Sequence, residues 1–182
     1  MLARVAIVLI LVASHATAEK VATPTCGPAK ATRKLTSLRG VDWCNFDFGF
    51  WKGAMREGHS SVHLYADMGG PDAAPHDTIA ASLRGVIYGD VDGDKRPEAA
   101  VVIQSSTYFG RSDKHSSHTS VYMYKLAGGK PAQLGSIPAG TPVDAVTIGK
   151  GIVTVTSGPP NATTTVRYRR VKDEFVEVPA TK

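Results

Sequence analysis

The sequence lacks an apolar run long enough to cross a membrane. The run from Val5 to Val12 is far shorter than the roughly 20 residues that a membrane-spanning helix needs. One cation, Arg4, precedes this run, and Ala16-Thr17-Ala18 matches the small-x-small cleavage pattern of exported proteins. We therefore expect residues 1–18 to be a secretory signal peptide and the mature chain to be secreted or periplasmic, without a stable membrane anchor. The alternative is a short buried core helix.

The sequence also lacks a strong excess of charge of one sign. Its formal net charge of +5 becomes +4 when Arg4 leaves with the signal peptide. The basic residues are scattered, and the densest group, Arg167 to Arg170, is followed by acidic residues at Asp173 and Glu174. A nucleic-acid interface needs a larger one-sided basic patch. Nucleic acid is therefore not an expected partner, and the sequence names no other.

Cysteine is scarce, with only Cys26 and Cys44. Their spacing is far from the Cys-x-x-Cys of many metal and redox sites, which remain the alternative interpretation. Two cysteines in an exported protein most simply form one disulfide. This bridge would close a loop of about 19 residues and stabilise the fold by roughly 3 kcal/mol on the chain-entropy model.

Several catalytic signatures are missing. No serine lies in a Gly-x-Ser-x-Gly or Ser-x-x-Lys frame, and no phosphate loop or dinucleotide fingerprint occurs. The sequence therefore favours a non-enzymatic protein. Paired carboxylates for glycoside cleavage stay open as the alternative, because they pair in space and not in sequence. That alternative is an extracellular, carboxylate-dependent hydrolase acting on carbohydrate, with Glu98 or an aspartate near it as one of its two carboxyls.

The chain that follows the signal is expected to form one domain. Residues 19–40 are rich in Thr, Pro, Ala and Lys and are predicted to be a loosely ordered lead-in that the disulfide tethers. Residues 41–182 are predicted to be a single β-rich domain. Five aromatic residues lie between Trp43 and Trp51, and we expect them to anchor the N-terminal segment on a core. They could instead line a binding groove.

Short alternating or apolar segments separated by turn residues indicate the fold class. Ala99 to Ile103 is apolar at every position, which predicts a central strand covered on both faces. The segment from Thr78 to Asp90 could start as a short helix or as a strand, and Val86, Ile87 and Tyr88 favour a strand at its end. Turn residues at Lys150 and at Lys172-Asp173 predict two hairpins. The fold expected is mainly β, an antiparallel sheet folded as a sandwich or partial barrel, with minor helix.

One acidic loop lies directly before the apolar strand. In "YGDVDGDKRPEAAVVIQ", aspartates occupy every second position at Asp90, Asp92 and Asp94, and Glu98 follows at position nine. Calcium takes six to eight oxygen ligands, and alternating aspartates in a tight turn supply several from one segment. These four residues are our candidate metal ligands, with Ca²⁺ as the candidate ion. The alternative is a solvated turn, in which Asp side chains bond nearby backbone amides.

This stretch of about 17 residues resembles the Asp-x-Asp-x-Asp-Gly-x-x-Asp calcium loops of FG-GAP and VCBS-type repeats. The resemblance implies a calcium site in a bacterial surface or secreted protein. The chain departs from that pattern at position six, where Lys95 replaces glycine, and at position nine, where Glu98 replaces aspartate. The function expected is therefore an exported, non-enzymatic binding or structural module, with a structural calcium in the loop from Asp90 to Glu98.

Overall fold

The computed structural model describes residues 19–30, 34–49, 54–64, 77–109, 115–149 and 151–179 of the 182-residue chain. The predicted signal peptide, residues 1–18, lies outside the described residues, as do Phe50 and Trp51 of the aromatic cluster. Within the described ranges, no helix is both long enough and apolar enough to cross a membrane.

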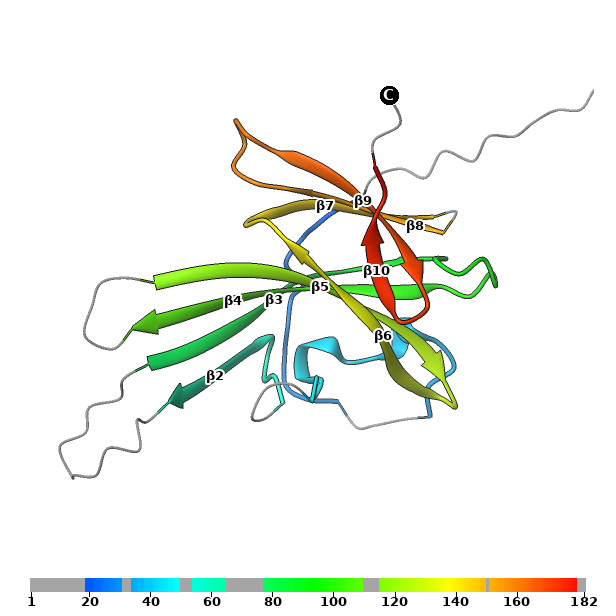
Figure 1. Cartoon of the computed structure of the whole chain (residues 1–182). Coiled ribbons are helices and arrows are strands. Elements are labelled where there is room, and N and C mark those ends of the chain that lie inside the picture. Colours follow the sequence, from blue (N-terminus) through cyan, green and yellow to red (C-terminus); the bar gives the residue numbers. More distant parts are fainter. Residues whose placement is uncertain are drawn as a thin grey trace, which may run out of the picture.

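Among the described residues, ten antiparallel strands form two five-stranded sheets, so the prediction of a mainly β sandwich with minor helix is confirmed (Figure 1). The C-terminal sheet has the order β1-β7-β8-β9-β10, and the central sheet has the order β2-β3-β4-β5-β6. The strands are β1 (Glu19–Lys20), β2 (His59–Leu64), β3 (Asp77–Gly89), β4 (Glu98–Phe109), β5 (His115–Ala127), β6 (Lys130–Ala139), β7 (Val143–Gly149), β8 (Ile152–Ser157), β9 (Thr164–Val171) and β10 (Glu174–Glu177). Two short 3-10 helices, η1 (Leu38–Gly40) and η2 (Trp43–Asn45), precede β2.

The hairpins predicted around Lys150 and around Lys172-Asp173 are the pairs β7–β8 and β9–β10. The segment that begins at Thr78 is strand as far as Gly89 and belongs to β3. One pairing lies far apart in the sequence: β1 pairs with β7, where Lys20 lies opposite Ala145. The first described residues therefore close one edge of the C-terminal sheet.

Strand β4 lies at the centre of the molecule and is covered on both faces. Its residues from Ala99 to Ile103 are each at most 1% exposed, as their uniformly apolar composition predicts. Side chains alternate across a strand, so Ala100 and Val102 enter one hydrophobic cluster, while Ala99, Val101 and Ile103 enter another. The central sheet is therefore the middle of three layers.

The first cluster fills the space between the two sheets. Residues of β4 and β5 on the central sheet meet residues of β7 and β8 on the C-terminal sheet, such as Val146, Ile148 and Val153. Each of these three is 8% exposed or less. Burial of branched apolar side chains at roughly 25 cal/mol per Å² is the main force that holds the two sheets together.

The second cluster lies under the N-terminal segment. Leu38 of η1, Trp43 of η2 and Phe48 pack with Met55 onto the other face of the central sheet. The Trp43 ring lies 5.1 Å from that of Tyr124, and its indole N–H donates to the Tyr88 hydroxyl at 3.1 Å. The described aromatics of the cluster are therefore core residues, as predicted. Figure 1 shows this segment in blue and cyan, on the side of the central sheet away from the C-terminal sheet.

The predicted disulfide joins Cys26 to Cys44. It holds the chain around Cys26 against η2, and two hydrogen bonds reinforce it. Asn45 Nδ2 donates to the Gly27 carbonyl at 2.9 Å, and the Lys30 N–H donates to an Asp42 carboxylate oxygen at 3.1 Å. Gly58 also lies against the bridge, because a Cβ at that position would be 2.8 Å from Cys26 Sγ. The tethered segment thus has defined contacts along much of its length.

The two sheets approach each other closely at Gly89, the last residue of β3. A Cβ at Gly89 would lie 2.5 Å from Ile148 Cβ and 2.8 Å from the Ile148 carbonyl oxygen. Only a residue without a side chain fits there, since a backbone atom is one of the neighbours. Directly after this contact the chain leaves the central sheet and enters the acidic loop.

The contact at Gly89 predicts that Gly89→Ala weakens the joint between the sheets. Overpacking of this kind costs about 1–3 kcal/mol. We expect urea unfolding to show a lower free energy of unfolding by that amount. Gly27→Ala is the matched control, because a Cβ at Gly27 would have no atom within 4 Å, and it should change the value by less than about 1 kcal/mol. Equal stability of the two variants would contradict the close contact.

Candidate metal site

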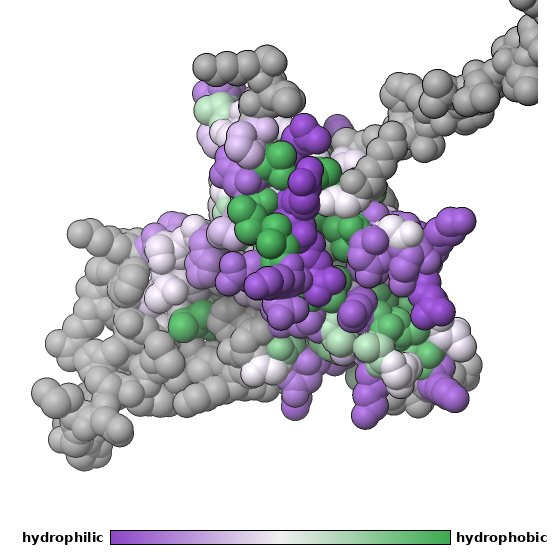
Figure 2. Space-filling view, turned by 45° about the vertical axis from the view of Figure 1, so that its right-hand side comes forward, coloured by the Kyte–Doolittle hydropathy of each residue, from purple (hydrophilic) through white to green (hydrophobic). Residues whose placement is uncertain are grey.

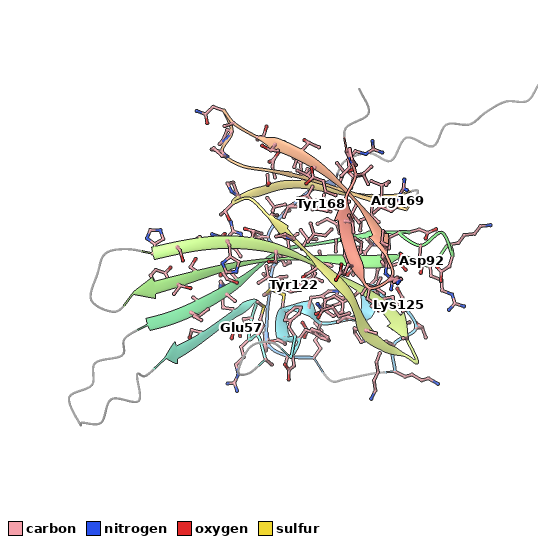
Figure 3. The ribbon with its side chains drawn as sticks, viewed as in Figure 1. Glu57, Asp92, Tyr122, Lys125, Tyr168 and Arg169 are labelled. Carbon is pink, nitrogen blue, oxygen red and sulfur yellow. A yellow bond between two sulfur atoms is a disulfide. The ribbon has the colours of Figure 1, made fainter. Side chains whose placement is uncertain are left out.

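The acidic loop connects β3 to β4 at the end of the central sheet where the C-terminal sheet crosses it. Asp90 follows directly on Gly89, and Glu98 is the first residue of β4. The loop therefore leaves the end of one buried strand and returns at the start of its neighbour. Figure 3 shows Asp92 at this end of the molecule, near the loop's charged tip.

The aspartates of the loop organise the turn through their own backbone. Asp90 accepts two hydrogen bonds, from the Gly93 N–H at 2.7 Å and from the Lys95 N–H at 3.0 Å. Asp92 accepts from the Asp94 N–H at 3.2 Å, and Asp94 accepts from the Arg96 N–H at 2.7 Å. These are the local bonds that favour Asp in turns.

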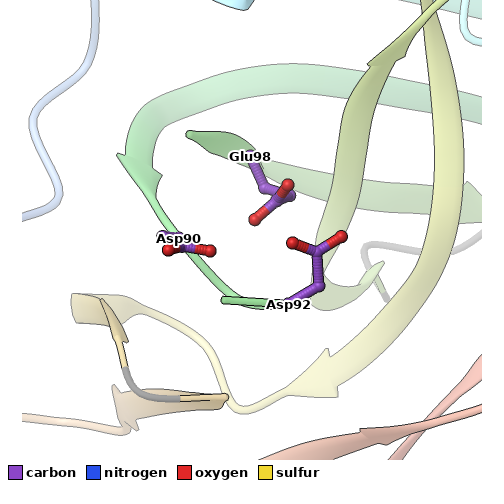
Figure 4. Close-up of side chains that lie close together, drawn as sticks. All are labelled: Asp90, Asp92 and Glu98. Carbon is purple, nitrogen blue, oxygen red and sulfur yellow. The ribbon is translucent and has the colours of Figure 1, made fainter. Parts of the chain in front are cut away.

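Three of the four predicted ligands converge. Asp90, Asp92 and Glu98 each offer a carboxylate oxygen, and these oxygens lie within 4.8 Å of one another (Figure 4). Calcium binds oxygen at about 2.3–2.6 Å, so ligand oxygens on opposite sides of one ion are about 5 Å apart. One cation can therefore contact all three carboxylates. Asp94 is not part of this group, and its described bond is the one to Arg96.

Glu98 is the unusual member of the group. Its side chain is only 2% exposed, and its Oε2 accepts a hydrogen bond from the Val91 N–H at 2.7 Å. Burial raises the pKa of this carboxyl above its ordinary value of 4.5, the Val91 N–H lowers it, and the negative charges of Asp92, Asp94 and Asp90 raise it further. A buried carboxyl beside three others is costly unless a proton or a cation neutralises it.

The two cations of the loop do not neutralise these carboxylates. Lys95 and Arg96 are exposed, and in the described part of the chain neither forms an ion pair with an aspartate or with Glu98. In a solvated turn, Lys95 and Arg96 would be expected to neutralise the neighbouring carboxylates. The cluster is therefore left with closely spaced negative charge, which is the electrostatic condition for binding a cation.

The loop makes its sharp turn without the glycine of the resembled motif. Lys95, at position six, adopts φ of +65°, and Gly93 adopts φ of +82°. A left-handed conformation at a non-glycine residue costs about 1–2 kcal/mol. Lys95 thus takes up the backbone shape for which the resembled repeats use glycine, and the Asp90 carboxylate holds its N–H in place.

Val91 is a functional residue of the loop that sequence reasoning did not identify. It is 2% exposed and belongs to the cluster between the two sheets, while its N–H binds Glu98. Gly151, in the turn between β7 and β8, lies beside its carbonyl, since a Cβ at Gly151 would be 3.8 Å from that oxygen. The one apolar residue among the alternating aspartates was the signal for this inward-pointing side chain.

Comparison of the chain with protein-family models, with curated proteins and with solved structures finds no match. The resemblance to FG-GAP and VCBS-type loops therefore stays a prediction. What the geometry defines is an acidic triad of Asp90, Asp92 and Glu98, which could hold a metal ion at the junction of two β-sheets.

The raised pKa of Glu98 predicts a pH dependence in metal-free buffer. Below pH 4.5 this carboxyl is protonated in both the folded and the unfolded chain. As the pH rises toward its folded-state pKa, the unfolded chain has released the proton and the folded protein still holds it, so stability falls. Glu98→Gln removes this fall and still accepts from Val91. The free energy of unfolding of the wild type, relative to Glu98→Gln, should therefore decline as the pH rises above 4.5.

The measurement is urea unfolding at several pH values, with exposed Glu174→Gln as the control variant. A difference between the wild type and Glu98→Gln that stays constant across this range would contradict a raised pKa. The prediction would also be contradicted if the wild-type free energy of unfolding declined by the same amount relative to Glu174→Gln, because the effect would then not be specific to Glu98.

Proposed function

We propose that this protein is an exported, non-enzymatic β-sandwich module whose acidic loop holds a structural calcium ion. The observation that carries the proposal is the convergence of three carboxylates, one of them buried, on a single point where the two sheets meet. Calcium suits this donor set because it is a hard cation that binds oxygen. Zinc sites more often use nitrogen and sulfur ligands.

The ion would be structural because of what its ligands are joined to. Glu98 begins β4, whose next five residues are buried, and Asp90 and Asp92 flank Val91, which enters the core between the sheets. An ion held by these three carboxylates would fix the loop to the start of β4 and to the C-terminal sheet. The Arg96 carbonyl, at position seven, and water would supply further oxygens.

The same geometry supports a metal site over a carbohydrate hydrolase. Glycoside cleavage uses two carboxyls about 5 to 9 Å apart that face a substrate. Here three carboxylate oxygens lie within 4.8 Å of one another, and Glu98 is 2% exposed and accepts from the Val91 amide. This arrangement favours a shared ion over a pair of carboxyls that faces a substrate.

Export is supported by the sequence of residues 1–18 and by the disulfide. The bridge between Cys26 and Cys44 fits an oxidising compartment such as the periplasm or the cell exterior. It also secures the segment that would directly follow the signal peptide.

Calcium should raise the thermal midpoint of the mature protein. At one hundred times its dissociation constant, a ligand of the folded state adds about 2.7 kcal/mol, or about 5–10 °C for a chain of this size. We expect this rise between chelator and excess calcium for the wild type and its loss in Asp92→Asn. Asp94→Asn is the matched control. It removes the same charge and keeps the same kind of turn bond, yet lies outside the triad.

Coincident unfolding curves in calcium and in chelator would make the loop a polar turn. An equal loss of the calcium effect in Asp92→Asn and Asp94→Asn would point to general electrostatic attraction instead of a defined triad. Magnesium at the same concentration tests selectivity, because it demands a tighter octahedral shell.

Expression of the full chain in a bacterial host tests export. We expect the protein recovered from the periplasm to begin at Glu19, as measured by intact mass, because Ala16 and Ala18 fit the cleavage pattern. Ala16→Arg with Ala18→Arg should block cleavage and leave the longer chain. Recovery of the wild type only from the cytoplasm, with residues 1–18 attached, would contradict export.

A further inference from the structure

The central sheet extends well beyond the C-terminal sheet that covers it. In Figure 1, the ends of β2, β3, β4 and β5 project to the left, past β7, β8 and β9. Along this extension, the face that packs on the C-terminal sheet at Val102 and Val121 changes from apolar to polar. We call it the Tyr108 face, which comprises Ser82, Gln104, Ser106, Tyr108, His115 and Ser117.

An aromatic pair lies at the outer end of the Tyr108 face. Tyr108 and His115 are directly opposite each other on β4 and β5, with ring centroids 6.0 Å apart and an angle of 26° between the rings. Tyr108 is 50% exposed, whereas the other aromatic side chains whose burial the structure describes are buried or half-buried. An exposed ring pair offers an apolar surface beside polar groups, which is how Tyr commonly serves in binding sites.

The next rows of the face carry hydroxyl and amide groups. Ser106 and Ser117 share a hydrogen bond of 2.8 Å between their hydroxyl oxygens, and Gln104 lies one row further in. Ser82 binds His59 Nδ1 at 3.1 Å across the strand pair. Each hydroxyl accepts two bonds and donates one, so a bonded pair still has sites to offer. None of the six residues of the face is lysine, arginine, aspartate or glutamate.

This chemistry selects the kind of ligand. An anion or a nucleic acid would need cations, which the face does not supply. An apolar partner would need a continuous apolar patch, and here hydroxyls interrupt the surface. A neutral sugar has both features that match: C–H faces that pack on aromatic rings, and hydroxyl groups that pair with hydroxyl and amide side chains.

We propose that the Tyr108 face binds neutral carbohydrate, with the Tyr108–His115 pair as the stacking platform and Ser106, Ser117 and Gln104 as hydrogen-bonding partners. This site is separate from the metal site. Glu98 and Tyr108 are at opposite ends of β4, roughly 30 Å apart along an extended strand. The proposal therefore goes beyond the structural calcium and does not rest on it.

The test is isothermal titration of the mature protein with maltohexaose, cellohexaose, xylohexaose and chitohexaose, in calcium and in chelator. We expect at least one of them to bind with a dissociation constant of about 1 mM or lower. Tyr108→Ala and His115→Ala should each weaken that binding about tenfold or more. The matched controls are Thr107→Ala and Ser116→Ala, a cross-strand pair next to the aromatic pair but on the opposite face of the sheet, and they should bind like the wild type.

Three results would overturn the proposal. The first is no heat of binding with any of the four sugars, while thermal unfolding shows a folded protein. The second is equal weakening by the control variants, which would place the site elsewhere. The third is concentration-dependent self-association in sedimentation that Tyr108→Ala abolishes, because the face would then be an interface with a second copy of the chain. Sugar binding that persists in chelator, with no effect of calcium on unfolding, would refute the metal site and leave this proposal standing.

Discussion

The whole architecture depends on β4, which is buried on both faces over five consecutive residues. From Ala99 to Ile103, β4 buries every side chain, alternating between the cluster beneath the C-terminal sheet and the cluster beneath the N-terminal segment. Such a strand requires a cover on each face. The C-terminal hairpins supply one cover, and the disulfide-tethered aromatic segment supplies the other. On the face that Figure 2 draws, hydrophilic residues lie beside smaller hydrophobic patches.

The acidic loop is a consequence of the same strand. The chain must pass from the close contact at Gly89 to the buried start of β4, and in that short distance it places Val91 in the core and Glu98 out of water. A carboxyl group at so buried a position carries an electrostatic cost, and in the part of the chain that the structure describes no ion pair offsets it. A bound cation would neutralise this negative charge and link the two sheets, since Glu98 begins β4 and Val91 packs between the sheets.

Sequence patterns predicted the features that depend on residues close together in the chain, and they missed the pairing of strands that are far apart in it. Apolar content on both faces identified β4, turn residues identified the hairpins β7–β8 and β9–β10, and two lone cysteines identified the bridge. The pairing of β1 with β7 could not be read, because two residues carry no register signal and their partner is more than a hundred residues away. In the loop, the spacing predicted four ligands. It could not show that the Asp94 carboxylate accepts from the Arg96 N–H and stays outside the triad, or that Glu98 is buried, because both depend on the folded path of the chain.

The tethered N-terminal layer has a consequence for how the molecule assembles. A ribosome produces Trp43 and Phe48 before any of the strands onto which they pack, so these aromatic side chains wait without a surface to cover. The bridge between Cys26 and Cys44 needs only 18 residues of separation and none of the sheet. Oxidation of the two cysteines can thus constrain this segment before the sheet forms, because short loops close at little entropic cost. The N-terminal layer is therefore synthesised first, but it can pack onto the central sheet only after that sheet has formed.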